Sequence, residues 1–442
     1  MSVSERPYTP DAASLVAAAS VQFTAAMSAF GGFEPHPRLV VAVSGGADSL
    51  ALLRLAHSWA TARGGRVRAV TFDHRLRPDS TVEAEHVARV CADLGIDHSL
   101  LTWEGDTPVT GIEAAARTAR YAALDRICRE TGTIHLLVGH HAGDQRETVV
   151  MRAARGQGYG RAGMAAMDFR HDCRLLRPLL GFEKTDLTAL CEALAQTWTE
   201  DPSNASDVYE RNRVRKQLGR LPRAEVAAMS TQIAESGRWR MHAERRTANA
   251  IATWARISPL GFAWVDWAAW HEAPPDPGAD REFLGRLTHT IGGRVYPPAR
   301  AALEAAFVAL DAGRGATVGG CVLRFGGGGL WVLRENRAHS APEDRVLWDG
   351  RFIVPEGVAV RAPQGPADRA LCRAALARAG NGEKPPPSAV FARMPMVDTV
   401  DGVCVPGASR YDPAAPVARF SPPQGATACA IWLAPVGASL IY

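Results

Sequence analysis

The stretch that decides the fold reads Val40-Val41-Ala42-Val43-Ser44-Gly45-Gly46-Ala47-Asp48-Ser49-Leu50. Its first four residues are apolar and rich in β-branched valine, which is typical of a strand buried on both faces. A serine and two glycines then interrupt the run, and a leucine-rich helical pattern begins at Leu50. The stretch therefore predicts a strand, a glycine turn and the first turn of a helix.

The glycine turn has the chemistry of an anion-binding loop. Glycines let the backbone approach an anion closely, and the N–H groups of the helix's first turn point toward it. It is not a Walker A loop, because no Gly-Lys-Ser/Thr sequence follows. An ordinary strand-to-helix turn is the competing interpretation, since Ser, Gly and Asp are common turn residues. The candidate phosphate-binding residues are Ser44, Gly45, Gly46, Ala47, Asp48 and Ser49.

Asp48 falls in the first turn of the predicted helix, where a carboxylate has two interpretations. It could simply cap the helix, which stabilises a protein by about 0.5–2 kcal/mol. If a triphosphate lies on the same N–H groups, a bare carboxylate would repel it, and a bridging Mg²⁺ removes that conflict. Because of the loop around it, we expect Asp48 to be a Mg²⁺ ligand.

Beyond this loop, strand and helix patterns alternate along the chain. Such alternation predicts an α/β fold with a doubly wound, Rossmann-like parallel sheet. Ligands of such sheets bind beyond the carboxyl ends of the strands. The expected strands are 66–72, 99–103, 134–139 and 174–176, and the expected helices are about 12–30, 80–95, 110–131 and 140–155.

Three polar clusters each follow a predicted strand: Ser44–Ser49, Asp73–Arg77 and His140–Thr148. Random polar turns would fall at both ends of a sheet, so this agreement indicates a site at one edge. Paired histidines in the third cluster could bind a metal, but they lack the HExxH spacing. In that cluster Asp144 and Glu147 share a helical face.

Two further clusters have a weaker signal. Glu113–Tyr121, which follows a capping-box pattern at Thr110–Glu113, places Glu113, Arg117, Arg120 and Tyr121 on one helical face. The segment 201–215 is a turn leading into a basic helix, a composition that suits phosphate backbones and base stacking. The competing interpretation of both is a solvated helix face held by weak ion pairs.

Composition limits the class of protein. At 442 residues the chain is expected to hold two to four domains. A net charge of +4 permits a nucleic-acid partner without requiring one. The eight cysteines form no CxxC pair, so zinc and iron–sulfur spacing is absent and reduced cytosolic thiols are expected. We find no signal-peptide pattern and no uninterrupted apolar run near the ~20 residues of a membrane span, so we expect a cytoplasmic protein.

The pattern changes after Pro222. A long helix is expected at 224–254, a loop at 274–277, a helix at 297–310 and paired strands at 317–334 around Gly326–Gly329. From Trp348 short apolar segments alternate with turns, which indicates a small α+β domain, with strands also expected in 426–442. The predicted division is a tail and helix start at 1–22, a catalytic domain at 23–222, a mainly helical middle domain at 223–340 and a C-terminal domain at 341–442.

These clusters together resemble the tRNA(Ile)-lysidine synthetases, a family of PP-loop ATP-pyrophosphatases. Ser44–Ser49 is similar to the SGGxDS pyrophosphate loop and Asp73–Arg77 to DHxLR, while Glu113–Tyr121 is similar to EAxARxxRY and His140–Thr148 to HHxDDQxET. RPLLxxxK is matched by Arg177–Lys184, and DxSNxxxxYxRNxxR by Asp201–Arg215. The resemblance covers roughly residues 39–223, and its last three patterns favour the narrower family over the superfamily.

The resemblance implies a carbon–nitrogen ligase that uses ATP and Mg²⁺. Such an enzyme adenylates the wobble cytidine of a CAU-anticodon tRNA(Ile) and then transfers L-lysine to it, releasing AMP and pyrophosphate. It implies catalytic roles for Asp48, Arg117 and Asp144, and a tRNA-binding C-terminal domain; it leaves the oligomeric state open, a homodimer included. The residues implied to bind lysine or tRNA are Asp73, His74, Arg77, Glu113, Arg120, His140, His141, Glu147, Asn204, Arg211, Asn212 and Arg215.

One position departs from the family pattern. Where the pattern has two adjacent aspartates, this chain has Gly143-Asp144. Only Asp144 can carry the acidic role, and we expect it to suffice because Asp48 also offers an oxygen ligand.

Three other functions compete with this one. A PP-loop tRNA thiolase shares the adenylation step, but such enzymes usually need a cysteine pair near the site, and none is present. A small-molecule synthetase of the asparagine or GMP synthetase kind usually carries a glutaminase domain, for which an N-terminal Cys nucleophile is lacking. A non-catalytic RNA-binding protein is disfavoured by the intact glycine loop.

Overall fold

The computed structural model describes residues 11–75, 80–103, 111–154, 162–170, 172–200, 210–258, 260–272, 279–294, 296–336, 347–349, 351–354, 360–379, 394–399, 402–405 and 419–420. The chain divides into two compact units, one running through His242 and the other from Ala243 to Cys429. The boundary falls within one long helix, α8 (Arg223–Trp254).

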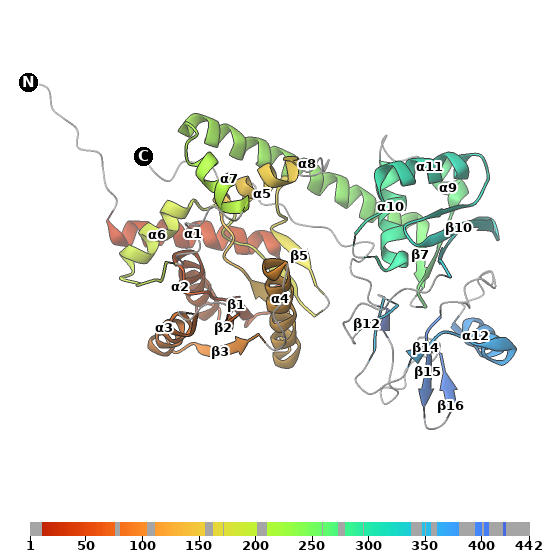
Figure 1. Ribbon diagram of the computed structural model, residues 1–442, viewed down its shortest axis with the longest axis horizontal. Coiled ribbons are helices and arrows are strands. Elements are labelled where there is room, and N and C mark those ends of the chain that lie inside the picture. Colours follow the sequence, from red (N-terminus) through yellow and green to blue (C-terminus); the bar gives the residue numbers. More distant parts are fainter. Residues whose placement is uncertain are drawn as a thin grey trace, which may run out of the picture. The chain divides into compact units, whose positions relative to one another are not determined.

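The first unit is built on a six-stranded sheet with the order β3-β2-β1-β4-β6-β5 (Figure 1). All pairs are parallel except β5 with β6. The predicted parallel sheet is therefore confirmed, while the short antiparallel edge strand β5 was not predicted. The strands are β1 (Arg38–Ala42), β2 (Arg66–Asp73), β3 (Asp97–Thr102), β4 (His135–Leu137), β5 (Met167–Phe169) and β6 (Arg174–Leu176).

Seven helices accompany this sheet among the described residues, and all lie at or close to the predicted positions except the helix at Lys184–Ala193, which was not predicted. One start differs: the N-cap of α4 is Gly111, in the left-handed region at φ 69°, and no side chain caps it. Thr110 and the side chain of Glu113, between which the capping box was predicted, lie outside the described residues. The helices are α1 (Ala12–Phe30), α2 (Ala47–Thr61), α3 (Ser80–Asp93), α4 (Ile112–Thr131), α5 (Ala142–Ala154), α6 (Lys184–Ala193) and α7 (Glu210–Leu218).

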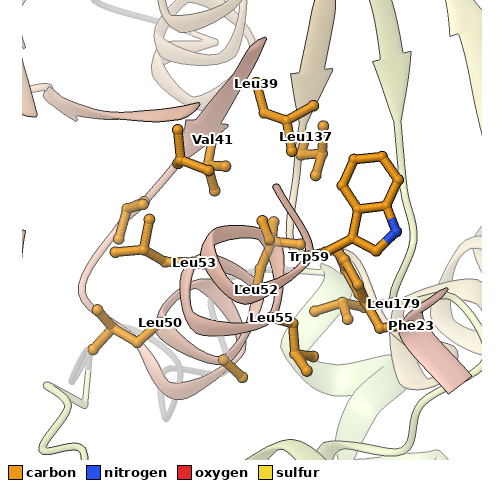
Figure 2. Packing of buried hydrophobic residues seen from close by; sticks show 14 of the residues in the cluster. Phe23, Leu39, Val41, Leu50, Leu52, Leu53, Leu55, Trp59, Leu137 and Leu179 are labelled. Carbon is orange, nitrogen blue, oxygen red and sulfur yellow. The ribbon is translucent and has the colours of Figure 1, made fainter. Parts of the chain in front are cut away.

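Both faces of the sheet are covered, because side chains alternate along β1. Leu39 and Val41 belong to a core that α1, α2 and α6 complete, and Figure 2 shows them beside the leucines of α2. Val40 points to the other face, into a core that includes Leu124 of α4. Each fully buried leucine contributes about 1.5–3 kcal/mol, so the central strand is fixed from two sides.

Helix α1 has a sequence long and apolar enough to cross a membrane, with a mean hydropathy of 1.4 over 18 residues. Ser20, Gln22 and Thr24 nevertheless interrupt its apolar run. Phe23 and Met27 of this helix are buried in the core of the first unit. Length and composition are therefore weak indications of a membrane span for α1, since a helix of a protein core meets the same criterion.

The second unit contains a five-stranded antiparallel sheet with the order β7-β8-β11-β10-β9. The predicted strand pair around Gly326–Gly329 is confirmed as the β10–β11 hairpin, whose turn places Gly327 and Gly328 at φ 65° and 86°. The elements are β7 (Ala255–Ser258), β8 (Phe262–Val265), β9 (Ala316–Val318), β10 (Cys321–Gly326), β11 (Gly329–Arg334), α9 (Trp267–Glu272), α10 (Ala279–Gly292) and α11 (Arg300–Asp311).

The described residues of the rest of the second unit include the short strands predicted after Trp348, arranged as two three-stranded sheets with one helix. The expected strands in 426–442 and the loop at 274–277 lie outside the described residues. The elements are β12 (Leu347–Trp348), β13 (Phe352–Ile353), β14 (Val360–Arg361), α12 (Gly365–Ala379), β15 (Met396–Thr399), β16 (Gly402–Cys404) and β17 (Arg419–Phe420).

Candidate active site

Two loops of the first unit meet where the strand order reverses, between β1 and β4. The glycine turn follows β1, and Gly139 follows β4. A Cβ placed on Gly139 would lie 3.3 Å from the carbonyl oxygen of Asp48, so the two backbones pass in van der Waals contact. This is the switch point at which open parallel sheets bind their ligands.

The glycine turn is held by its own serines and by a neighbouring loop. Ser49 Oγ donates to Gly46 O at 2.9 Å and accepts from Ser44 N at 3.1 Å. Gly45 adopts φ 90°, a conformation that favours glycine, and its carbonyl accepts from Thr199 N at 3.0 Å. Gly46 is the N-cap of α2 and receives no side-chain cap, so the first-turn N–H groups lie at the mouth of the turn.

Asp48 does not act as a helix cap. Its Oδ1 is buried and has no hydrogen-bond partner, and its Oδ2 lies 3.6 Å from Nε2 of His141. Burial raises the pKa of Asp48, and Asp144 adds to this, although His141 and Lys184 oppose it. A buried carboxylate oxygen without a partner is costly. A ligand that paired with Oδ1 would remove this cost, so Oδ1 is suited to a binding position.

Asp144 lies close by, at the start of α5. Its Oδ2 accepts from the His141 backbone N–H at 2.9 Å, and its Oδ1 accepts from Arg211 at 2.5 Å. Burial alone would raise the pKa of Asp144, but the neighbouring His141, the Arg211 guanidinium, His140 and the hydrogen bond from the His141 backbone together lower it. Asp144 is therefore a stable carboxylate at neutral pH.

Glu147, one turn further along α5, joins this helix to α7. Arg211 Nε and Arg215 Nε each donate to it at 2.6 Å, and its side chain is only 3% exposed. The two arginines expected to contact tRNA thus also neutralise the acidic face of α5. Charge-assisted hydrogen bonds of this kind are the strong ones, so α7 is bound firmly to α5.

A cavity of about 390 Å³ opens beside these carboxylates, within the size range of small-molecule sites. His140 lines it, and burial lowers the pKa of this histidine to about 3, with Arg177 and Arg211 opposing its protonation and Asp144 favouring it. Its Nδ1 is buried without a hydrogen-bond partner. The other lining residues are Arg117, Thr148, Met151, Arg152, Met164, Ala165, Asp168, Arg177 and Arg211.

Several predicted site residues take other places. The carboxylate of Asp73 accepts from Arg75 N at 2.8 Å and so closes the turn after β2, beside the half-buried His74. Arg120 lies over the ring of Tyr121, 5.4 Å from its centre, and Asn212 is buried on α7. Arg77 and Asn204, and the side chain of Glu113, lie outside what the structure describes.

Two charged residues of the cavity were missed by the sequence analysis. Arg152 lines the cavity one helical turn after Thr148, and the i, i+4 spacing on α5 was a signal for it. Asp168 lies on β5, the strand that was not predicted, so no pattern pointed to it.

The fold and the glycine turn define a PP-loop protein. The sequence model of the family described as PP-loop domain matches residues 18–221, and this class of domain uses ATP. Among similar proteins, the tRNA(Ile)-lysidine synthase of Rhizobium meliloti is 38% identical over 72% of this chain and 73% of the relative. That of Hyphomonas neptunium is 40% identical over 64% of this chain and 77% of the relative. The chain belongs to the tRNA(Ile)-lysidine synthase family.

Among solved structures, one that matches part of the chain is that of a U34-tRNA thiolase from Methanococcus maripaludis. It has a TM-score of 0.45 and 16% identity, and the match covers 51% of this chain and 79% of that one. Similarity at this level does not distinguish between activities.

Proposed function

We propose that this protein is a carbon–nitrogen ligase that joins L-lysine to C2 of the wobble cytidine in tRNA(Ile) with a CAU anticodon. The observation that supports this best is the contact between Gly139 and Asp48, because it joins the pyrophosphate loop to the acidic helix α5. A nucleotide on the first would lie beside a substrate on the second.

The chemistry needs both halves of the site. The C2 carbonyl oxygen of cytidine is a poor leaving group, so it first attacks the α-phosphate of ATP and pyrophosphate departs. The amine of lysine then attacks C2, the bond to the adenylated oxygen breaks, and AMP leaves. The backbone N–H groups after Gly45 and Gly46 suit the phosphates, and electrostatic stabilisation of the departing charge follows from the same groups.

Asp48 fits a Mg²⁺ ion, which would neutralise charge on the phosphate oxygens. The buried Oδ1 of Asp48 has no protein partner, and Mg²⁺ in ATP sites is commonly bound by one or two carboxylates together with phosphate oxygens. Among the described residues no group of three or more His, Cys, Asp or Glu side chains could hold a metal. The carboxylate of Asp48 and the nucleotide itself are therefore the ligands we propose.

We assign lysine recognition to the carboxylates of α5 and the cavity arginines. Asp144 is ionised, so it attracts the side-chain ammonium of lysine, while a guanidinium such as Arg117 or Arg177 suits the α-carboxylate. A carboxylate with a lowered pKa is a weak base, so Asp144 is better suited to hold the amine in place than to accept its proton.

The tRNA would reach this site over the basic side chains of the first unit. We propose that Arg211, Arg215 and the C-terminal domain, 341–442, bind it, and that the protein acts in the cytoplasm. Arginine suits this role because its planar fork matches phosphate oxygens.

The test is to incubate the protein with ATP, labelled lysine and unmodified CAU-anticodon tRNA(Ile), and to analyse the nucleosides. We expect lysidine from the wild type and none from Asp48→Asn. Asp97→Asn is the matched control, because Asp97 is exposed and lies at the amino end of β3, whereas the site lies beyond the carboxyl ends of β1 and β4. In single turnover, Asp144→Asn should slow lysine transfer. Wild-type protein that forms no lysidine would overturn the proposal.

A further inference from the structure

The ring of His141 has one orientation, set by the backbone beside it. The N–H of Gly143 donates to His141 Nδ1 at 3.0 Å. That nitrogen must therefore carry a lone pair, so the neutral ring has its proton on Nε2. Nε2 faces two carboxylates, 3.6 Å from Asp48 Oδ2 and 3.7 Å from Asp144 Oδ2.

This orientation requires a residue without a side chain at position 143. A Cβ placed there would lie 2.7 Å from Cε1 and 3.0 Å from Nδ1 of His141, closer than real Cβ contacts. The backbone of Gly143 is not among those with positive φ, so conformation does not demand glycine. The demand is for space, and because His141 is only 6% exposed, its ring has little room to move aside.

The two oxygens of Asp48 consequently face different surroundings. Nε2 carries the ring proton and lies 3.6 Å from Asp48 Oδ2, which is longer than a hydrogen bond. It has no lone pair for a metal, so His141 presents the positive end of its N–H dipole to Asp48 and is not a metal ligand. Oδ1 is left buried and unpartnered. A group that fixes one carboxylate oxygen determines where the other one points, and such outer partners commonly change metal affinity by about 10–100-fold.

We propose that Gly143 and His141 form a positioning pair that holds Asp48 by Oδ2 and so directs Oδ1 toward the metal bound with ATP. The inference rests on the proposed function, since it concerns the same nucleotide site. It also assigns a role to the one position where the chain departs from its family pattern: the glycine that stands there in place of an aspartate leaves room for the His141 ring.

The experiment measures binding of a non-hydrolysable ATP analogue to the full chain at increasing Mg²⁺ concentration. Gly143→Ala and Gly143→Asp should each raise the Mg²⁺ concentration for half-saturation by about tenfold or more, with analogue binding without Mg²⁺ unchanged. Gly219→Ala is the matched control, because a Cβ there meets only ordinary contacts at 3.5 Å. If Gly143→Asp lowers the Mg²⁺ concentration for half-saturation instead, the added carboxylate acts as a metal ligand that the wild type lacks, and the inference is wrong.

A double-mutant cycle separates ring displacement from other effects. In a His141→Leu background, Gly143→Ala should add nothing, since there is no ring left to orient; additive losses would refute the pair. His141→Gln keeps an N–H donor, so its Mg²⁺ concentration for half-saturation should rise less than that of His141→Leu. This comparison gives an answer even if the glycine variants do not fold. A wild type that fails to bind the analogue contradicts the proposed function, whereas normal binding with unaffected variants contradicts only this inference.

Discussion

His140 should make the first unit lose stability in mild acid, by an amount that follows from its surroundings. Burial lowers the pKa of its imidazole to about 3 in the folded protein, with Asp144 opposing the shift and Arg177 adding to it. In the unfolded chain the ordinary pKa is about 6.5. Between these two values the unfolded state binds the proton and the folded state does not, so the free energy of unfolding falls as the pH falls.

The magnitude can be worked from the linkage relation. One pH unit inside this window corresponds to about 1.4 kcal/mol, and between pH 7 and pH 5 the His140 contribution amounts to about 2 kcal/mol. In a His140→Gln variant this contribution is absent. The wild type should therefore lose about 2 kcal/mol more than the variant over the same change of pH.

The assay is hydrogen exchange of the amides of α5 and β4, corrected for intrinsic rates, because it reports the opening of this part of the chain. It is run on the wild type, on His140→Gln and on His36→Gln, in which the replaced histidine is exposed. His36→Gln should follow the wild type. Equal losses for the wild type and His140→Gln would refute the reasoning, since the His140 ring would then be taking up its proton without unfolding.

Two further predictions concern buried ion pairs. Glu147→Gln should destabilise the first unit by about 1–3 kcal/mol, because it removes the partner of two arginines; Arg300→Ala, at an exposed pair, should change stability by under about 1 kcal/mol in the same urea titration. Asp349→Asn should cost about 3–5 kcal/mol in the second unit, since the carboxylate lies between the buried Arg334 and Arg351. If the thermal midpoint of Asp349→Asn shifted no more than that of Arg300→Ala, this prediction for Asp349 would be contradicted.

The sheet could be predicted from the sequence because its strands carry an unmistakable composition. Val40 and Val41 are buried on opposite faces, so an uninterrupted apolar run was the correct signal for a central parallel strand. The strands that escaped prediction have only three or four residues, as β5, β7 and β8 do. A segment that short has little periodicity of its own, although β4 and β6, each of three residues, were predicted.

The candidate site could be predicted only where residues follow a strand directly. Asp48, His141 and Asp144 come together because β1 and β4 are neighbours in the sheet. The pairing of Arg211 with Asp144 and Glu147 is different. It joins residues more than sixty positions apart through the packing of α7 on α5, and a basic helix looks the same in sequence whether it meets phosphates or carboxylates.

Three glycines of the site show why composition cannot assign roles by itself. Gly45 is needed for its backbone angle, since φ 90° strains any other residue. Gly139 lets two loops approach closely, since a Cβ there would lie 3.3 Å from the Asp48 carbonyl oxygen. Gly143 leaves room for the His141 ring, since a Cβ there would lie 2.7 Å from Cε1. In the sequence all three are glycines after or near a strand. The reason differs each time: backbone conformation at Gly45, backbone approach at Gly139 and side-chain space at Gly143. The test differs accordingly. Only at position 143 should removal of the neighbouring His141 ring make substitution by alanine harmless.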